Sequence, residues 1–435
     1  MEEILLFWNP WWKGEYLLES INRSEYFNKI NLFIQRKEVL CFSGVRRSGK
    51  STLMLQTIQS LLETVNNRNI LYINFDDERF VGILDEKLLD KILNEYCSML
   101  NPEGKLFVFL DEIQSVPFWE KWVKRMYDSQ KNIKFVISGS SSALVSSEFS
   151  TLLTGRNLLI EVFPFSFKEF LEYKCVSVGS YSSVKSAYLD LYDKRTNISY
   201  YLDEYLKSGG FPEVVKDSSV ELRLELLQRY FRDILYKDLV KRYKIKKSSL
   251  LEQLALYLLT NFTNKFSINK LAKYFGCGFD TVKEFLGYLD SAYLLFTIEF
   301  FSFSKKESLQ KPLKSYCIDG GMRNNLVLKF SRDSGRLAEN LVFLYLKRVF
   351  RTVYYWDSNN EVDFVVYDKK LKLFNVSYGD LNERESKGLV ELAKKRKSDC
   401  FLITNDLYDS KKIDGINIKL VPLWLFLCLD ASALK

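Results

Sequence analysis

One segment constrains the fold of this chain more than any other: Gly44-Val45-Arg46-Arg47-Ser48-Gly49-Lys50-Ser51, which fits the phosphate-loop pattern G-x-x-x-x-G-K-[ST]. The apolar run Val39–Ser43 predicts a strand before it, and the spacing of apolar residues over Ser51–Val65 predicts a helix after it. A loop between a strand and a helix binds phosphate groups, because its backbone N–H groups and the positive N-terminal end of the helix are directed at the same site. The sequence therefore predicts a nucleotide-binding α/β core.

The loop residues have separate expected roles. Lys50 is expected to reach the β- and γ-phosphates, and the Ser51 hydroxyl is expected to ligate Mg²⁺. Arg46 and Arg47 are candidates for contact with phosphate or with a partner. The residues expected to bind the nucleotide are Gly44, Val45, Arg46, Arg47, Ser48, Gly49, Lys50, Ser51, Thr52 and Ser138.

A second apolar run, Leu106–Leu110, ends in Asp111 and Glu112. Such a run predicts a strand buried on both faces, and ligands bind at the carboxyl ends of strands in these sheets. Asp111 is expected to hold Mg²⁺, directly or through water, so the predicted metal ligands are Ser51 and Asp111. Glu112 is expected to orient and deprotonate the attacking water, which makes Lys50 and Glu112 the main predicted catalytic residues.

Two further residues have two interpretations each. Ser138 ends a predicted strand, Phe135–Ser138, and either senses the γ-phosphate beside Asp111 or caps a following helix. Arg156 precedes another predicted strand, Leu158–Phe163. It is either an arginine finger that acts in trans as a catalytic residue, or one side of a structural ion pair.

Strands alternate with helices through the first part of the chain, which predicts a parallel sheet. A strand–helix unit, Ile70–Leu100, lies between the loop helix and Asp111, and leaves room for an additional strand between the two motif strands. This arrangement resembles the AAA-type branch of P-loop ATPases, in which a Glu follows the metal-binding Asp. It favours ATP hydrolysis over a kinase or a GTP switch, and the sequence contains no guanine-reading [NT]-K-x-D motif.

Taken together, the motifs resemble an archaeal and bacterial family of predicted AAA-type P-loop ATPases with a C-terminal restriction-endonuclease-like domain of unknown function. The resemblance covers nearly the whole chain, and its other motifs are specific only in combination. They are Asn9–Trp12, Gly44–Thr52, Asn74–Asp77, Leu110–Gln114, Ser138–Ser141, Leu153–Arg156, Phe163–Phe170, Gly209–Glu213, Gly335–Asn340 and Glu361–Phe364.

The C-terminal part of the resemblance implies a single Mg²⁺ site that has degenerated. Glu339 and Asp363 match the helical Glu and the strand-end Asp of restriction-endonuclease-like folds. Asn375 stands where that fold has a second carboxylate, and Ser377 where it has a Lys. Losing an anionic ligand weakens a site for a hard cation, so we expect a domain used for binding, with an active nuclease as the alternative.

The region between the two domains predicts three helices and a strand, over Ser249–Leu259, Ser267–Gly276, Asp280–Ser291 and Leu294–Phe301. This order is typical of a winged helix, and the alternative is a helical lid or spacer. Residues 174–435 hold 43 Lys and Arg against 32 Asp and Glu, a net +11 that favours contact with a polyanion such as DNA. A cluster from Lys237 to Lys247 is the first candidate for phosphate contact, and solvated lysines are the alternative.

The predicted fold class is thus α/β: a P-loop ATPase core with a parallel sheet, a helical and winged-helix region, and a mixed α/β restriction-endonuclease-like domain. The expected boundaries are residues 1–27 for an aromatic arm, 28–173 for the core, 174–243 for a helical lid, 244–306 for the winged helix and 307–435 for the last domain.

Composition narrows the chemistry. The chain has no His, which excludes imidazole bases and His metal ligands, and its seven Cys never form C-x-x-C. No apolar run is long enough for a membrane span and no signal peptide is evident, so a cytoplasmic location without membrane contact is expected.

The predicted function is an ATPase that couples its nucleotide state to a C-terminal binding domain. The expected cofactors are ATP and Mg²⁺, and the expected partners are DNA and further copies of the chain. Two alternatives stay open: an ATP-gated DNA nuclease, and a slow nucleotide-dependent regulator or scaffold.

Overall fold

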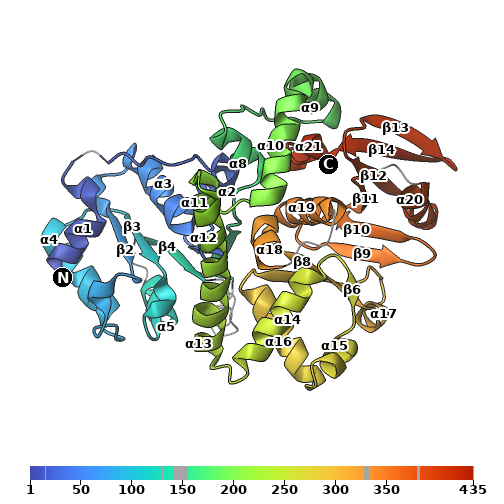
Figure 1. Ribbon diagram of the computed structural model, residues 1–435. Helices are drawn as coiled ribbons and strands as arrows, with labels where there is room; N and C mark the ends of the chain where they lie inside the picture. The colour runs from blue at the N-terminus through green and yellow to red at the C-terminus, as the bar shows by residue number, and fades with distance from the viewer. Residues whose placement is uncertain (15, 130–131, 141–154, 328–332, 380–382, 435) are drawn as a thin grey trace. The chain divides into compact units, whose positions relative to one another are not determined.

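The computed structural model describes residues 1–435 except 15, 130–131, 141–154, 328–332, 380–382 and 435 (Figure 1). The chain forms two compact units, residues 1–163 and residues 164–435, and each is described by itself. In the described residues, no helix is both long enough and apolar enough to cross a membrane.

The first unit is built on a parallel five-stranded sheet in the order β2-β3-β4-β1-β5. The strand that carries the phosphate loop, β1, and the strand that ends in Asp111, β3, are separated by one further strand, as expected. That strand is β4, however, and the strand of the unit Ile70–Leu100, β2, lies on the far side of β3. The strands are β1 (Val39–Gly44), β2 (Ile70–Asn74), β3 (Leu106–Asp111), β4 (Ile133–Ser140) and β5 (Asn157–Glu161).

Helices cover both faces of this sheet because its strands are apolar on both sides. Val39 and Cys41 of β1 face one hydrophobic core, formed with α1 (Glu2–Trp8), α4 (Leu88–Leu100) and α5 (Trp119–Asp128). Leu40 and Phe42 face the other core, formed with α2 (Ser24–Ile34) and α3 (Lys50–Leu62).

The aromatic N-terminal segment protects the edge strand β2. After helix α1, the buried Asn9 side chain pairs with Tyr72 as a neighbouring strand would: its amide donates to the Tyr72 carbonyl at 2.9 Å and accepts from the Tyr72 N–H at 2.7 Å. The indoles of Trp11 and Trp12 donate to the Ile70 carbonyl at 3.2 and 2.9 Å. Polar groups that an edge strand would expose are therefore satisfied.

The second unit begins with helices that run from Phe167 to Tyr243. The sequence predicts a helical lid up to residue 243, and the last part of it forms an α-helix, a π-helical segment over Ile234–Val240 and a last α-helical turn. The helices are α8 (Phe167–Tyr173), α9 (Val184–Leu191), α10 (Arg195–Ser208), α11 (Pro212–Lys216), α12 (Val220–Asp233) and α13 (Lys241–Tyr243).

A three-stranded antiparallel sheet follows in the order β6-β8-β7. Strand β8 (Leu313–Cys317) pairs with both of its neighbours, so this sheet extends past residue 306, where the sequence pattern places a domain boundary. The other elements are α14 (Ser248–Thr260), β6 (Lys265–Phe266), α15 (Ile268–Tyr274), α16 (Phe279–Ser291), β7 (Leu295–Ile298) and α17 (Lys305–Gln310).

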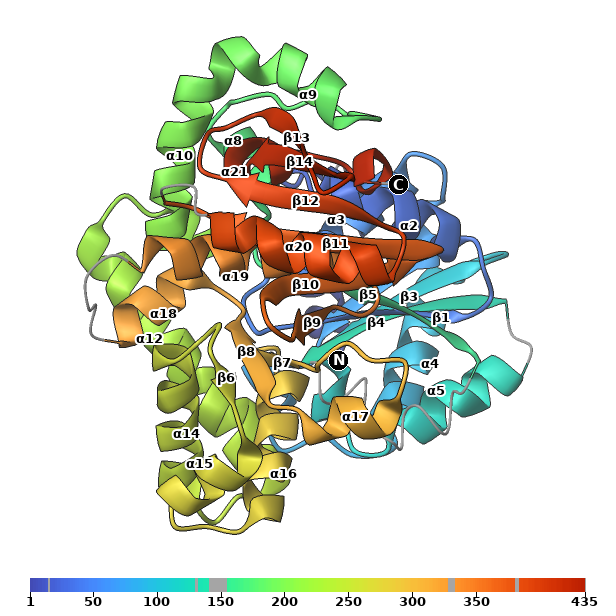
Figure 2. The ribbon, with the colours of Figure 1, turned by 90° about the vertical axis from the view of Figure 1, so that its right-hand side faces the viewer.

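The chain ends in a mixed six-stranded sheet in the order β13-β14-β12-β11-β10-β9 (Figure 2). Helix α20 (Glu383–Lys395) lies across one face of this sheet and α19 (Ser334–Val349) packs on the other (Figures 1 and 2). Short helices α18 (Gly320–Leu326) and α21 (Leu423–Phe426) precede and follow these elements. The strands are β9 (Tyr354–Asp357), β10 (Glu361–Asp368), β11 (Lys370–Ser377), β12 (Ser398–Thr404), β13 (Asp409–Ile413) and β14 (Ile416–Pro422).

Candidate nucleotide site and a buried charge cluster

The loop between β1 and α3 folds tightly for two different reasons at its two glycines. Gly49, the N-cap of α3, has φ of 92°, and Arg47 is also left-handed with φ of 68°. Gly44 is needed for a close approach instead, because a Cβ there would lie 2.0 Å from the carbonyl oxygen of Val162. The segment after β5 therefore packs directly on the start of the loop.

Lys50 points back into the loop. Its side chain is only 4 % exposed, and its Nζ donates to the carbonyls of Gly44 at 3.0 Å and Val45 at 3.1 Å. The same Nζ lies 4.0 Å from Oε1 of Glu112. The ammonium thus sits between the loop and the carboxylate that follows β3.

Arg23 braces the loop, a role that no sequence motif indicated. It is buried at 1 % exposure, and its guanidinium donates to the carbonyls of Ser48 at 2.7 Å and Phe163 at 2.9 Å. These bonds tie the loop to the segment after β5. An isolated Arg far from the motif gives no signal that could predict this long-range contact.

Asp111 is fully buried and held by hydroxyl groups. Tyr72, on the neighbouring strand β2, donates to Oδ2 at 2.7 Å, and Ser138 donates to Oδ1. Burial and the charge of Glu112 raise the pKa of Asp111, against hydrogen bonds from Ser138, Ser51 and Tyr72 that favour the carboxylate. Tyr72 was not predicted, because the pairing of β2 with β3 cannot be read from either strand alone.

Ser138 links the two acidic residues. Besides its bond to Asp111, its hydroxyl accepts from the Glu112 N–H at 3.1 Å. Glu112 adopts the left-handed region with φ of 53°, and Gln114 Nε2 donates to its Oε2 at 2.5 Å. The expected position of Ser138 beside Asp111 is therefore observed, whereas Ser141 of the same motif lies outside the described residues.

The arginines lie in different places. Arg46 forms an ion pair with Asp76 at 3.5 Å, close to the loop. Arg156 pairs with Asp128 at 2.8 Å, and its carbonyl accepts from the Val39 N–H, so it lies where β1 and β5 begin. The strands begin at this end of the sheet, and the phosphate loop lies at the opposite end, where β1 finishes. The structure therefore does not bring Arg156 to the loop of its own chain. Leu153 and Thr154 of its motif lie outside the described residues.

The loop and its surroundings fit a nucleotide with Mg²⁺. Ser48 Oγ is buried inside the loop with no hydrogen-bond partner among the described residues, so a donor is available where a phosphate oxygen would lie. The Ser51 hydroxyl and the Asp111 carboxylate are hard oxygen donors of the kind that Mg²⁺ prefers. Lys50 supplies a positive charge within the same loop, 4.0 Å from Glu112.

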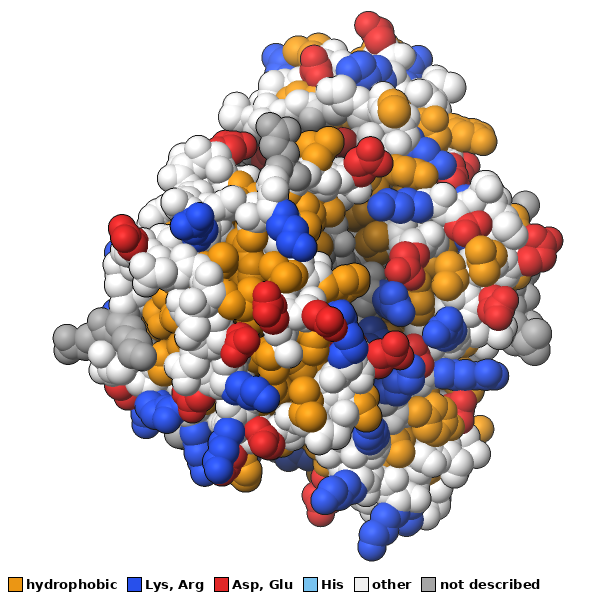
Figure 3. Space-filling view, turned by 90° about the vertical axis from the view of Figure 1, so that its left-hand side faces the viewer, with side chains coloured by type: hydrophobic (Ala, Val, Ile, Leu, Met, Phe, Trp, Pro, Cys, Tyr) orange, Lys and Arg blue, Asp and Glu red, His pale blue; other side chains and the backbone are white. Residues whose placement is uncertain are grey.

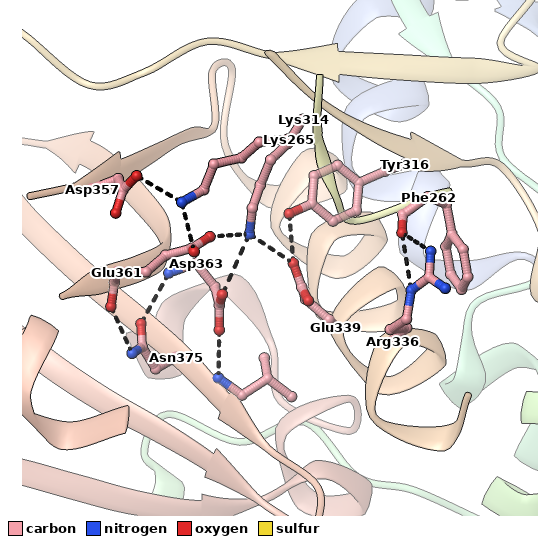
Figure 4. Close-up of polar contacts among 11 residues, drawn as sticks. Phe262, Lys265, Lys314, Tyr316, Arg336, Glu339, Asp357, Glu361, Asp363 and Asn375 are labelled. Carbon is pink, nitrogen blue, oxygen red and sulfur yellow. Dashed lines mark hydrogen bonds and ion pairs between the residues drawn. The ribbon is translucent and has the colours of Figure 1, made fainter. Parts of the chain in front are cut away.

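A second cluster of buried charge lies in the other unit, at the residues predicted to be a degenerate metal site (Figure 4). Glu339 of α19 and Asp363 of β10 do come together, but around an ammonium group that was not predicted. Lys314 of β8 places its Nζ 3.1 Å from Glu339, 3.4 Å from Asp363 and 2.6 Å from Glu361. Burial opposes this ammonium, but the surrounding acidic groups outweigh it and raise the pKa of Lys314.

The positions that depart from the nuclease pattern have structural uses. Asn375 accepts from the Asp363 N–H at 2.9 Å and donates to the Glu361 carbonyl at 3.1 Å (Figure 4). It also donates to the carbonyl of Glu385 at 2.7 Å. Ser377 is also buried, and its hydroxyl bonds to Glu385, which opposes the rise that burial causes in the pKa of that carboxyl. Among the residues that the structure describes, no group of three or more Asp, Glu or Cys side chains is arranged to hold a metal ion.

The comparisons with known proteins agree with the first site. Residues 36–171 match a family model described as an AAA domain, and residues 199–334 match one described as a domain of unknown function. The class is therefore that of AAA-type P-loop ATPases, as the five-stranded parallel sheet and its motifs indicate. A restriction-endonuclease-like domain is not among the matched families.

Two relatives that match nearly the whole chain show the family to which it belongs. It is 34% identical to the uncharacterized protein MJ1544 of Methanocaldococcus jannaschii over 94% of this chain and 88% of that protein. It is 30% identical to an uncharacterized protein of Haemophilus influenzae, over 93% of this chain and 98% of that protein. The chain belongs to the same family of AAA-domain proteins as these two.

Solved structures are more distant. The Aeropyrum pernix ORC1 protein in complex with DNA matches at 13% identity and a TM-score of 0.30, over 73% of this chain and 94% of that one. A variant of Thermotoga maritima RuvB matches at 18% identity and a TM-score of 0.29, over 63% and 89%. At such scores neither protein indicates what this chain binds.

Proposed function

We propose that this protein is a Mg²⁺-dependent ATPase whose site is the phosphate loop together with Asp111 and Glu112. The observation that carries the proposal is the position of the Lys50 ammonium, enclosed by the loop and 4.0 Å from Glu112. A cation, a metal-binding carboxylate and a candidate base are thereby gathered at the carboxyl ends of two strands of one sheet.

Bound ATP would supply the γ-phosphoryl group, and bound Mg²⁺ would neutralise the charge that develops on it. In this chain, Ser51 and Asp111 would hold the metal, and the loop N–H groups and Lys50 would hold the phosphates. Glu112 would take a proton from the attacking water through Oε1, since its Oε2 accepts from Gln114. Ser138 would sense the γ-phosphate, because it is bonded to both Asp111 and Glu112.

Nucleotide binding can be tested by the thermal stabilisation that MgATP gives to the full chain. Stabilisation should reach about 2.7 kcal/mol at 100-fold excess over Kd in the wild type and disappear in Lys50→Ala. Lys134→Met is the matched control, because Lys134 is another buried lysine of this unit, bonded to the carbonyls of Phe33 and Arg36 at 2.7 and 3.0 Å. Equal stabilisation of wild type and Lys50→Ala would contradict the proposal.

We further propose that the chain acts as an oligomer, with Arg156 reaching the nucleotide site of a neighbouring copy. Support comes from its position at the far sheet edge, where its side chain is 37 % accessible and its ion-pair partner Asp128 is 46 % accessible. Mixing Arg156→Ala chains with Lys50→Ala chains should restore ATP turnover if the finger acts in trans. If Arg156 serves a structural ion pair alone, the mixture should be no more active than its components.

DNA is the second partner that we propose, through the basic segment rather than through the three-helix region. The order α14-β6-α15-α16-β7-β8 supports a winged-helix arrangement. However, the exposed side of α16 carries Asp280, Glu284 and Asp290 against Lys283, which phosphate groups would repel. On the face drawn in Figure 3, basic and acidic side chains are also interspersed.

The stretch that follows the π-helical segment is different, since Lys241, Lys244, Lys246 and Lys247 are all exposed. Replacing Lys244, Lys246 and Lys247 with Gln should weaken duplex binding and reduce its salt dependence by about one unit of slope per lysine. Gln at Lys394, Lys395 and Lys397 is the control, because the first two are paired with Asp414 and Glu391. Unchanged duplex binding in the first variant would contradict this proposal and would mean that these lysines are only solvated.

A further inference from the structure

The charge cluster around Lys314 has a geometry that differs from an empty metal site. The Lys314 side chain is 4 % exposed, and its ammonium contacts carboxylates from a strand and a helix: Glu361 and Asp363 of β10, and Glu339 of α19 (Figure 4). Tyr316, two residues along β8, donates to the same Glu339 oxygen at 2.8 Å. One oxygen of each of these three carboxylates is thus already bound to a group of the protein.

A second lysine closes the outer side of the cluster. Lys265 of β6 lies 2.7 Å from Asp357 and 2.8 Å from Glu361. A divalent cation placed on Glu339 and Asp363 would lie within a few ångströms of the Lys314 ammonium, and like charges repel strongly in a buried site. The carboxylate that could complete such a site is replaced by Asn375, whose amide is bonded to the backbone.

Both lysines come from the three-stranded sheet, and the acidic residues come from α19 and the six-stranded sheet. The two sheets are also joined by backbone bonds: Phe301 N–H donates to the Tyr355 carbonyl at 2.6 Å, and Tyr355 N–H donates to the Glu299 carbonyl at 3.1 Å. The Tyr355 hydroxyl donates to the Pro312 carbonyl at 2.5 Å. The ion cluster lies beside this junction, because Asp357 and Tyr355 belong to the same strand.

We propose that Lys314 permanently takes the place of a divalent cation in this cluster, which fastens the three-stranded sheet to the six-stranded sheet and does not cut DNA. The cluster and its role are independent of the proposed ATPase site. We expect the cluster to bind metal only after the lysine is removed.

Manganese binding to the full chain without nucleotide tests the proposal, with free Mn²⁺ measured by electron paramagnetic resonance. Lys314→Met should bind one more Mn²⁺ per chain than the wild type, and adding Asp363→Asn should abolish the gain. Lys372→Met is the control, because Lys372 is also buried, at 1 % exposure, but lies 3.9 Å from one carboxylate, Asp399. Absence of any gain in a folded Lys314→Met chain would overturn the proposal.

A second comparison does not depend on the folding of that variant. The wild type and Glu339→Gln should bind the same amount of Mn²⁺, and the wild type should leave labelled single- and double-stranded DNA intact in the presence of Mn²⁺. A Mn²⁺ ion that the wild type binds and Glu339→Gln loses would overturn the proposal. Mn²⁺-dependent cleavage that this substitution abolishes would do so as well, and would establish the nuclease alternative.

Discussion

At the residue scale, Tyr72 connects two parts of the first unit. Its backbone is paired with Asn9 of the N-terminal segment, and its hydroxyl donates to Asp111. A buried carboxylate that loses a donor is harder to keep ionised, because a hydrogen bond to a charged group contributes about 1.5–3 kcal/mol. Tyr72 therefore helps to keep Asp111 in the form that a metal ion requires.

Tyr72→Phe should consequently lower ATP turnover by roughly tenfold and raise the Mg²⁺ concentration needed for the half-maximal rate. Its effect on the free energy of unfolding should be similar to that of removing any other buried tyrosine hydroxyl. Tyr96→Phe is the matched control, because Tyr96 is fully buried in the same unit and its hydroxyl donates to the Arg68 carbonyl at 2.6 Å. Steady-state rates across a Mg²⁺ series separate the two. Equal effects of both variants on turnover would show that Tyr72 has only a structural role.

Asp319 should make the free energy of unfolding of the second unit depend on pH. It caps α18 and accepts from the N–H groups of Gly210 at 2.6 Å and Met322 at 2.8 Å, but burial raises its pKa from 3.8 to about 6. Between these values the folded chain keeps a proton that the unfolded chain loses. The contribution is fully present below about pH 4 and is lost as the pH rises through about 6.

Relative to Asp319→Asn, the wild type should lose about 2 kcal/mol of unfolding free energy between pH 4 and pH 7. The predicted quantity is the change with pH, because the substitution itself alters the contact with Gly210. Denaturant unfolding of both proteins at several pH values measures it. Parallel pH profiles would contradict the raised pKa.

How much the sequence predicts differs among these residues. The loop, Asp111, Glu112 and Ser138 were found because local patterns place them at strand ends, and the structure gathers them at one edge. Arg23, Tyr72 and Lys314 were missed, since each acts through a partner at least 25 residues away in the chain. Such pairings depend on strand order and side-chain direction, which apolar spacing does not encode.

At the element scale, helix α20 depends on one glycine. Gly388 allows α20 to approach β10, because a Cβ at this position would lie 2.0 Å from the Glu361 carbonyl oxygen. The same Glu361 contacts Lys314 and Lys265. Helix position and ion cluster are therefore joined through one strand residue.

Gly388→Ala should destabilise the chain by roughly 1–3 kcal/mol, because the added methyl group forces α20 away from the sheet. Gly287→Ala in α16 is the control: nothing lies within 4 Å of the position of its Cβ, and a helical Gly→Ala change should stabilise by about 0.5–1 kcal/mol. Thermal unfolding of both variants gives the comparison. A stable Gly388→Ala chain would show that α20 can move freely on β10.

Most elements were predictable where their apolar pattern is strong. The strands of the first sheet and helix α4 (Leu88–Leu100) form close to the expected residues. Strands β13 and β14 were not predicted, because Asp409–Ile413 is largely exposed and rich in charge. They form because β14 pairs in parallel with the buried strand β12 and then extends the sheet to β13.

At the scale of the whole molecule, the second unit is one continuous structure from residue 164 onward. The pattern of helices followed by mixed strands favours separate winged-helix and C-terminal domains, but β8 completes the first sheet while its Lys314 lies in the charge cluster of the second. The sequence of a strand such as β8 does not by itself show which of two sheets the strand joins. The domain boundaries of this region stay a prediction.

The central claim is that the first unit hydrolyses ATP through Glu112. Phosphate release from MgATP by the full chain, compared between the wild type and Glu112→Gln with ATP binding measured in parallel, tests it most directly. We predict that Glu112→Gln binds ATP as the wild type does but turns it over at least about 100-fold more slowly. Equal rates of phosphate release in the two proteins would contradict the claim.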